Sequence, residues 1–343
     1  MKKIIAYYLP QYHETPENNK WWGQGFTEWT NIKNAVQYSR KQTIRKPTEL
    51  GYYDLSSCDI IEKQFKLAKE HNISGFCLWT YWFGEGKKLL DAPLRWMLEK
   101  DLAVDYCVAW ANHSWLNKTK GILLQEQKYL GEKDYEDFFD YMLPHFKREQ
   151  YIKDNGRPIV VVFEARAIPD FNVFINTFNR KAQENGFPGI YLITEYTIPE
   201  YEYVEKVDAF LDSSLMYSRR GFWDKVRERL VRRHRWKWLG PVKYSYKNYI
   251  LGLWNKKRKP HDKEIPVIIS GWDTTPRHKR LGVIYEGFNE NLFTTSVKEA
   301  IDFNENNQYV FLKSWNEWAE GNTVEPDTIY GRKLLEAIKK HNV

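Results

Sequence analysis

Residues 311–326 read FLKSWNEWAEGNTVEP and join a buried strand to a polar, aromatic turn. The apolar run begins at Tyr309 and continues through Leu312, which is typical of a strand covered on both faces. The residues after it are polar or aromatic, and Gly321 supplies a position where the backbone can turn. The stretch therefore predicts a group of functional side chains at the carboxyl end of a buried strand.

Two carboxylates three residues apart, Glu317 and Glu320, lie in this turn beside Trp315 and Trp318. An indole packs against the apolar C–H face of a pyranose, and a carboxylate pair supplies the acid and the base for chemistry at a glycosidic oxygen. The alternative is a solvated loop whose tryptophans only pack. At the end of a strand, the pattern favours a sugar site.

Apolar runs like this one recur along the chain, with amphipathic helical patterns between them. The predicted strands are residues 4–9, 73–81, 104–111, 158–165, 189–195, 209–213, 265–272 and 309–314, and helical patterns include 60–70, 135–146, 171–184, 292–303 and 331–341. Eight such units predict a (β/α)8 barrel, and we expect residues 1–343 to form a single barrel domain. A doubly wound sheet is the alternative, but no glycine-rich turn follows an early strand, as nucleotide-binding versions require.

In such barrels the catalytic face is formed by the carboxyl ends of the strands. Polar and aromatic residues follow nearly every predicted strand, and aromatic residues make up 16% of the chain, which suits carbohydrate contact or a large core. The candidates for substrate contact are Tyr8, Tyr12, Trp29, Trp79, Tyr81, Trp82, Asn112, Trp115, Glu195, Trp272, Asp273, Arg277, Trp315, Asn316 and Trp318. We expect them to surround Glu317 and Glu320.

Two long segments interrupt the alternation of strands and helices. Residues 15–53 follow the first strand and carry WWGQGFTEWTN, which suggests a loop folded over the site. Residues 218–263 follow the sixth strand and hold 16 Lys and Arg against three acidic residues, whereas the net charge of the whole chain is +7. The first half of this basic segment fits a helix with Trp223, Val226, Leu230 and Val231 near one face.

The basic segment has several interpretations. A basic amphipathic helix with tryptophan can lie on an anionic membrane surface, or it can bind the phosphates of a lipid-linked or nucleotide-linked sugar. A variable, solvated insertion is the plainer alternative. Nucleic acid is not an expected partner, because no motif that reads DNA or RNA is present.

The cysteines and the N-terminus bear on location. Cys58, Cys77 and Cys107 are scattered without metal-ligand spacing and indicate free thiols of a reducing compartment. The first apolar run is too short for a signal peptide, and no apolar run approaches a membrane span. We expect a cytoplasmic protein, and the alternative is a cytoplasmic protein that also contacts the inner face of the membrane.

Seven motifs together resemble a known family. In order they are YYLPQYH, WWGQGFTEWTN, LGYYDL, GFCLWTYWF, WANHSW, GWDTTPR and WNEWAEGNTVEPD. They resemble the WbsX-like proteins of bacterial polysaccharide gene clusters, which are related to glycoside hydrolase family 99. The resemblance spans residues 4–331 but is absent from the basic segment, and His113 stands where WANENW would have an acidic residue.

The resemblance implies a barrel that performs retaining chemistry on α-mannoside-type linkages without metal or cofactor. Carried over by position, Glu317 would take the proton from the sugar's own 2-hydroxyl, whose oxygen then attacks the anomeric carbon to give a 1,2-anhydro sugar. Glu320 would protonate the leaving oxygen and later activate water or an acceptor. We expect burial to raise the pKa of Glu320 enough for this acid role.

Three functions follow for the chain. The first is a glycoside hydrolase or transglycosidase acting on a bacterial surface polysaccharide. The second is a glycosyltransferase of O-antigen or capsule synthesis, although the sequence has no D-x-D metal motif at a strand end and no phosphate-binding glycine loop. The third is a carbohydrate-binding protein without catalysis, which has no need of two acids at this spacing.

Overall fold

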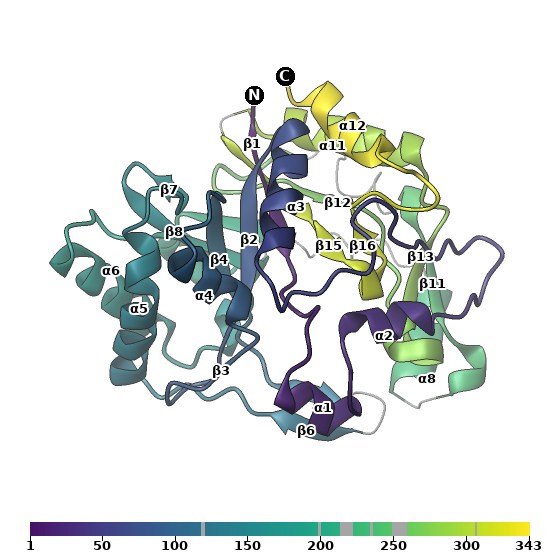
Figure 1. The fold of residues 1–343 in the computed structure, drawn as a ribbon, viewed down its shortest axis with the longest axis horizontal. Coiled ribbons are helices and arrows are strands. Elements are labelled where there is room, and N and C mark those ends of the chain that lie inside the picture. Colours follow the sequence, from purple (N-terminus) through teal and green to yellow (C-terminus); the bar gives the residue numbers. More distant parts are fainter. Residues whose placement is uncertain (118–120, 198–199, 213–221, 234–235, 249–258, 306) are drawn as a thin grey trace.

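The structure is a computed structural model that describes residues 1–117, 121–197, 200–212, 222–233, 236–248, 259–305 and 307–343. Residues 218–221, 234–235 and 249–258 of the basic segment therefore lie outside the described residues. Figure 1 shows a central sheet with helices around it and both chain termini at one end.

In this described part, eight parallel strands form a nearly closed barrel. In spatial order they are β10 (Ala209–Asp212), β9 (Tyr191–Thr197), β8 (Arg157–Val162), β4 (Tyr106–Trp110), β2 (Ile73–Trp82), β1 (Lys3–Tyr8), β14 (Tyr309–Lys313) and β12 (Val267–Ile269). Between β10 and β12, the main chain of Phe210 hydrogen-bonds to Lys263 and Ile265 at 3.0 and 2.9 Å. The predicted (β/α)8 fold and its eight strands are confirmed, because the sheet curves round until its two edges nearly meet.

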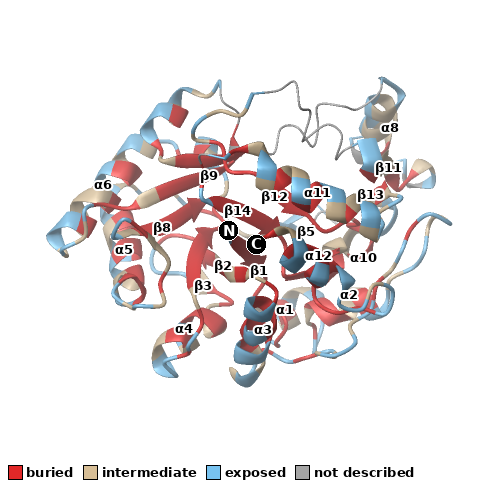
Figure 2. Ribbon diagram, turned by 90° about the horizontal axis from the view of Figure 1, so that it is seen from above, coloured by how far each residue is buried: buried red, intermediate tan, exposed pale blue. Residues whose placement is uncertain are grey.

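The strands read as continuous apolar runs because both of their faces are covered. All five residues of β14 are buried, as are Ile4–Tyr8 in β1, and the register pairs Ile5 with Phe311. Figure 2 shows the buried strands at the centre and helices whose outer faces are exposed. Lys313 is the one charged residue in these two buried runs.

The helices cover the outside of the barrel or lie near its rim. Their bounds are α1 (Pro16–Trp22), α2 (Glu28–Lys33), α3 (Asp59–Glu70), α4 (Ala92–Glu99), α5 (Glu132–Phe146), α6 (Phe171–Glu184), α8 (Phe222–Arg232), α10 (Thr275–His278), α11 (Glu290–Phe303) and α12 (Lys333–His341). Asp170 caps α6 and Asn289 caps α11 through side-chain oxygens that accept from main-chain N–H groups of the first turn. Each predicted helical pattern is confirmed, with ends that differ by a few residues.

Short elements build the rim at the carboxyl ends of the strands. They include the hairpin β5 (Trp115–Asn117) with β6 (Ile122–Gln125), the pair β11 (Val242–Ser245) with β13 (Val283–Glu286), and β15 (Asn316–Glu317) with β16 (Asn322–Thr323). The two-residue strand β3 (Lys88–Leu89) pairs with the carboxyl end of β2, whereas β7 (Lys153–Asp154) pairs with the amino end of β8, at the opposite end of the barrel. The 3-10 turns are Ala165–Ala167, Glu202–Lys206, Lys237–Leu239, Lys279–Leu281 and Trp318–Glu320. In Figure 1, α1, β6 and α8 lie in the lower part of the view, opposite the termini.

The basic segment supplies α8, the turn Lys237–Leu239 and strand β11. The predicted helix is confirmed, but its inward face differs in part from the expected one. Val231 is fully buried and Val226 and Leu230 are half-buried, whereas Trp223 is 78% exposed.

Candidate active site

A cavity of about 620 Å³ opens at the carboxyl ends of the barrel strands. Glu317 and Glu320 both line it, together with five of the predicted substrate contacts: Trp79, Tyr81, Trp115, Trp272 and Arg277. Trp22, Phe26 and Glu28 add a wall from the loop of residues 15–53, so this loop does reach the site as predicted. The carboxylates therefore lie in one enclosed, aromatic space.

The turn that carries the two carboxylates begins where β14 ends. The Ser314 hydroxyl donates to the Asn322 carbonyl at 2.6 Å and accepts from the Glu317 main-chain N–H at 3.0 Å. Gly321 has φ +61°, and a Cβ at this position would lie 2.9 Å from Cβ of Asp273. The left-handed backbone and the close neighbour together require glycine directly after Glu320.

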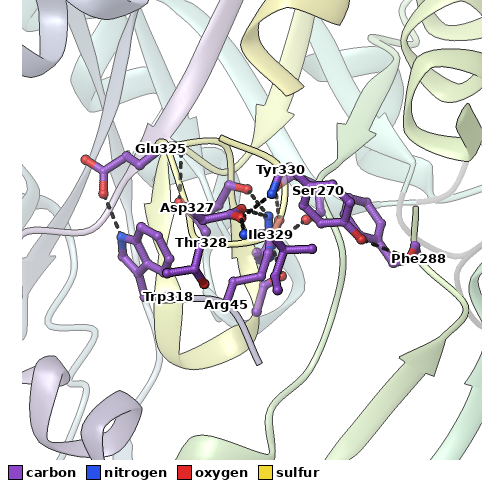
Figure 3. Close-up of polar contacts among 12 residues, drawn as sticks. Arg45, Ser270, Phe288, Trp318, Glu325, Asp327, Thr328, Ile329 and Tyr330 are labelled. Carbon is purple, nitrogen blue, oxygen red and sulfur yellow. Dashed lines mark hydrogen bonds and ion pairs between the residues drawn. The ribbon is translucent and has the colours of Figure 1, made fainter. Parts of the chain in front are cut away.

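Arg45 binds main-chain carbonyls of this turn, and Figure 3 shows it among its polar partners, with Ser270 and Asp327 labelled. Its guanidinium donates to the carbonyls of Gly321 at 2.6 Å, Thr323 at 2.9 Å and Ser270 at 2.8 Å, and it forms an ion pair with Asp327 at 3.3 Å. Both charged side chains are almost fully buried. Because the planar guanidinium offers five donors in fixed directions, one side chain fixes several carbonyls of the turn and of the neighbouring strand end at once.

Glu317 faces the cavity and accepts a hydrogen bond from the indole N–H of Trp79 at 2.8 Å. Trp79 is itself fixed by stacking on Tyr7, with ring centroids 4.6 Å apart. Burial, followed by the charge of Glu320, raises the pKa of Glu317 to about 7, while Arg277, the Trp79 hydrogen bond and Lys313 act in the opposite direction. A carboxyl group with a pKa near neutrality is suited to proton transfer at physiological pH.

Glu320 is bound by Arg277, whose Nη1 donates to its Oε1. The Nε of the same guanidinium donates to Glu28 at 3.1 Å, so Arg277 bridges two carboxylates from separate parts of the chain. The Glu28 side chain is 5% exposed and Glu320 is 19% exposed. The sequence predicted the proximity of Arg277 to the site, and this contact places its guanidinium directly on the candidate acid.

Lys313 and Glu195 form a buried ion pair at the base of the cavity, and the Tyr7 hydroxyl donates to the second Glu195 oxygen at 2.6 Å. Lys313 and Tyr7 line the cavity, but Glu195 is fully buried beneath them. Glu195 was predicted to contact substrate; the structure places it one layer below, where it fixes the ammonium group that approaches Glu317.

The two tryptophans next to the carboxylates pack away from the cavity. Trp315 is fully buried against Phe76, with ring centroids 5.3 Å apart. Trp318 is 2% exposed and donates its indole N–H to Glu325 at 2.6 Å. The expectation that these two indoles flank the sugar is therefore not met, since the turn directs them into the core and other aromatic residues line the cavity.

Five further predicted contacts also lie outside the cavity lining, where they fix the rim from behind. Tyr8 donates to Gln64 at 2.8 Å, Tyr12 donates to the Asn316 carbonyl, and Trp29 donates to the Tyr53 carbonyl at 2.6 Å. Trp82 donates to Asp134 at 3.1 Å, and the Asn316 amide pairs with both main-chain groups of Leu9. These side chains hold β1, β2 and the carboxylate turn together.

Asn112 and Asp273 have similar positioning roles. The Asn112 side chain donates to the Glu164 carbonyl at 2.8 Å and accepts from the Glu164 N–H at 2.8 Å, which ties the end of β4 to the end of β8. Asp273 accepts from Thr275 and from Gln42, and its main-chain N–H donates to the Glu320 carbonyl at 2.6 Å. Both are buried and outside the cavity lining.

Several residues that line the cavity were not among the predicted contacts. They include Tyr7, Glu28, His113, Phe163, Glu164 and Lys313. Strand parity would have identified the first and last of these. Successive strand residues point to opposite faces, so Tyr7 points into the barrel and Tyr8 points outward to α3. Lys313 is a charged residue inside an otherwise apolar run.

The fold and the cavity together are those of a (β/α)8 barrel with two carboxylates at the carboxyl ends of its strands. A family model described as "Glycosyltransferase WbsX" matches residues 4–338, and the chain belongs to this family. Two curated relatives are described as "Uncharacterized protein WxcX", from two strains of Xanthomonas campestris pv. campestris. Each is 28% identical over 351 residues, which cover 98% of this chain and 49% of the relative, so the chain spans about half the length of these relatives.

Solved structures share the fold at low sequence identity. A glycoside hydrolase family 99 endo-alpha-mannosidase from Bacteroides thetaiotaomicron, in complex with bis-tris-propane, is 16% identical with a TM-score of 0.59, covering 99% of this chain and 96% of that one. A "glycoside hydrolase-like protein" is 16% identical with a TM-score of 0.61, covering 99% of this chain and 93% of that one. At these identities the likeness establishes the fold.

In the part of the chain that the structure describes, no helix has the length and hydrophobicity needed to cross a bilayer. Among the same residues, no cluster of three or more His, Cys, Asp or Glu has an arrangement that could hold a metal ion.

Proposed function

We propose that the protein is a retaining glycoside hydrolase or transglycosidase that cleaves a mannoside-like linkage in a bacterial surface polysaccharide. The observation that carries the proposal is the pair Glu317 and Glu320, which share one cavity at the carboxyl ends of the strands. The pKa of Glu317 near 7 supports it, because a base of that pKa is half ionised at neutral pH.

In the first step, Glu317 accepts the proton of the sugar's 2-hydroxyl as the oxygen of that group bonds to the anomeric carbon. The bond from the anomeric carbon to the leaving oxygen breaks, and Glu320 delivers a proton to that oxygen. The product is a 1,2-anhydro sugar with inversion at the anomeric carbon. Glu317 leaves this step protonated and Glu320 leaves it ionised.

In the second step, Glu320 takes a proton from water or from an acceptor hydroxyl, whose oxygen attacks the anomeric carbon. The bond from this carbon to the 2-oxygen breaks, and Glu317 returns its proton to that oxygen. The second inversion restores the original configuration, so the overall reaction retains it. Both carboxyl groups regain their initial states.

Arg277 must release the Oε1 of Glu320 if that oxygen is the one that carries the proton, since the Nη1 of Arg277 donates to it. A proton can reach the leaving oxygen from that atom only after the contact breaks. Glu28 already accepts a hydrogen bond from Arg277 at 3.1 Å and can keep the guanidinium bound when it leaves Glu320. We therefore propose that substrate shifts Arg277 towards Glu28, which makes Arg277 and Glu28 part of the substrate-binding machinery.

The test is turnover by the wild type, Glu317→Gln and Glu320→Gln, with exposed Glu336→Gln on α12 as the matched control. Purified surface polysaccharide is incubated with each protein, and the products are followed by mass spectrometry. The proposal predicts fragments from the wild type and the control and losses of at least about 10²-fold in both site variants. Cleavage by either site variant at near wild-type rate would remove that carboxylate from its role.

A glycosyltransferase acting on a lipid-linked or nucleotide-linked sugar is the second candidate. One observation favours it: Glu228 and Tyr244, both from the basic segment, line the same cavity as the carboxylates. Residues 218–263, from which both come, hold 16 Lys and Arg, and this charge suits phosphate groups carried by such a sugar. A mass increase of a lipid-linked acceptor, only in the presence of a sugar donor, would move the protein to the transferases.

Binding of polysaccharide without turnover by the wild type in either assay would instead assign a carbohydrate-binding role. For location, we propose the cytoplasm, with peripheral attachment at the inner face of the membrane. Fractionation of cells that produce the full-length protein tests this: its appearance in the periplasmic or secreted fraction would contradict it.

A further inference from the structure

Large apolar side chains are exposed on two sides of the cavity opening. On one side, Leu116, Ile122 and Leu123 of the β5–β6 hairpin are each about half exposed, and Trp22 of α1 is 43% exposed. On the other side, Phe222 and Trp223 at the start of α8 are 72% and 78% exposed. Two further tryptophans beside α8, Trp236 and Trp238, are 46% and 72% exposed.

Both groups belong to elements that also contribute residues to the cavity lining. Trp22, Leu116 and Leu124 line it from one side, and Glu228 of α8 and Tyr244 of β11 line it from the other. Figure 1 shows α1, β6 and α8 in the lower part of the molecule, away from the termini and α12. We call the exposed residues around this opening, Trp22, Leu116, Ile122, Leu123, Phe222, Trp223, Trp236 and Trp238, the mouth surface.

The mouth surface is unusual for a face that meets only water. Single exposed apolar residues are common, but a group around one opening marks an interaction site. Its aromatic rings are paired: Trp236 stacks on Trp238 with centroids 6.1 Å apart, and Phe222 packs on Trp223 at 5.4 Å. Tryptophan has the apolar body and polar N–H that suit the boundary between lipid chains and headgroups.

The charge beside these rings indicates what they meet. Lys225 and Arg229 are exposed and lie three and seven residues after Phe222, on the same side of α8. Arg233 is exposed just beyond the helix. The exposed charged side chains described in residues 222–233 are all basic, so this part of the surface complements a negatively charged partner.

We propose that the mouth surface docks on an anionic lipid bilayer, so that the cavity opens toward the headgroups. The tryptophans enter the interfacial layer and the lysine and arginine residues meet anionic headgroups. Resting on the proposed function, this names the substrate class: a glycan anchored in the same bilayer, whose sugar linkages reach Glu317 and Glu320 from the membrane side.

The test is co-sedimentation with vesicles of phosphatidylcholine alone or of phosphatidylcholine mixed with equal phosphatidylglycerol. We expect binding only to the anionic vesicles, and release at high salt because exposed charges are screened. Lys225→Glu with Arg229→Glu, and Trp223→Ser with Trp238→Ser, should each weaken binding about tenfold or more. The matched controls are Lys339→Glu with Lys340→Glu on α12 and Ile329→Ser, which are exposed outside the mouth surface and should bind as the wild type does.

Two further measurements distinguish a failure of this proposal from a failure of the proposed function. Glu317→Gln should bind vesicles like the wild type, whether or not the wild type cleaves any glycan. Turnover of a water-soluble glycan fragment should be unchanged in the Lys225/Arg229 pair, while turnover of the same glycan on a vesicle-anchored lipid falls. Thermal midpoints equal to the wild type establish that these variants are folded.

The proposal is overturned by any of three results. The first is no binding of the wild type to anionic vesicles, or equal binding to neutral ones. The second is an equal loss of binding in the α12 control. The third is competition of vesicle binding by a soluble acidic polysaccharide such as polygalacturonate, which would assign the mouth surface to the glycan chain itself.

Discussion

Nη2 of Arg45 donates to the carbonyl oxygen of Gly321 at 2.6 Å, and Gly321 directly follows Glu320. The two residues are far apart in the chain, and Arg45 comes from a loop that follows the first strand. The contact fixes the main chain that carries the candidate acid without touching the acid itself. Arg45 is therefore a positioning residue for the proposed reaction.

Replacing Arg45 should lower kcat more than it raises KM. Arg45→Lys keeps the charge but loses the planar fork, so the carbonyls of Gly321, Thr323 and Ser270 lose donors that fix the turn. We expect kcat to fall about 10²-fold, the loss that a displacement of about 1 Å can cause. Steady-state kinetics on folded protein measure the split, and exposed Arg332→Lys on the outer surface is the control. An unchanged kcat would contradict the positioning role.

The acidic side of the pH–rate profile should report Glu317. Its pKa is raised to about 7, and the proposed base must be ionised, so kcat/KM should fall as pH decreases below about 7. Trp79→Phe removes the indole N–H that favours the ionised carboxylate. That variant should move the acidic limb to higher pH. A limb that stays in place would show that Trp79 does not act on the group that is titrating.

Glu325 should make the protein less stable as the pH rises from about 4.5 to 7. Burial raises the pKa of this carboxyl to about 7 in the folded state, against 4.5 as its ordinary value. Over that window the folded state holds a proton that the unfolded state has lost, so the unfolding free energy decreases with pH. The total change is about 3 kcal/mol for a shift of this size.

Glu325→Gln should remove that slope. Denaturant unfolding at several pH values measures it, and the variant should also be less stable at low pH, because an amide NH2 then faces the indole N–H of Trp318. A pH slope as large as that of the wild type would assign the titration to another group. Glu317 contributes a slope of the same sign, so the comparison is made between variant and wild type at each pH.

Gly321→Ala should impair both stability and turnover. The left-handed φ of +61° costs an L-residue about 1–2 kcal/mol, and the new methyl group would lie 2.9 Å from the Asp273 Cβ. Relief of that contact moves the Glu320 main chain. Gly331→Ala is the matched control, since it also has positive φ but has no atom within 4 Å of the added Cβ. A larger loss of activity in the control than in Gly321→Ala would contradict this account of the turn.

Much of the fold could be predicted from the sequence, because parallel strands covered on both faces leave an apolar run at each strand. The two carboxylates could be predicted for a related reason, because Glu317 and Glu320 closely follow such a run. Which neighbours face them was harder to predict. Trp318 is adjacent to Glu317 in sequence, yet it turns into the core to reach Glu325, whereas Trp79 arrives from another strand.

Long-range charges were the least predictable part of the site. Arg277 was expected near the rim, but its bridge between Glu28 and Glu320 depends on how two loops close over the barrel. Lys313 could be placed by strand parity, but its buried partner Glu195 was assigned to substrate because it ends a strand. The rule that functional residues follow the strand ends locates the rim of the barrel. The alternation of side chains along each strand, together with packing, decides which of these residues reach the cavity.

The central claim is that Glu317 and Glu320 perform a double displacement through the sugar's own 2-oxygen. The most direct measurement is proton NMR of the anomeric centre during the first minutes of turnover, before the free sugar equilibrates. The account predicts that the first-formed product keeps the configuration of the substrate linkage. A first-formed product of inverted configuration would contradict it.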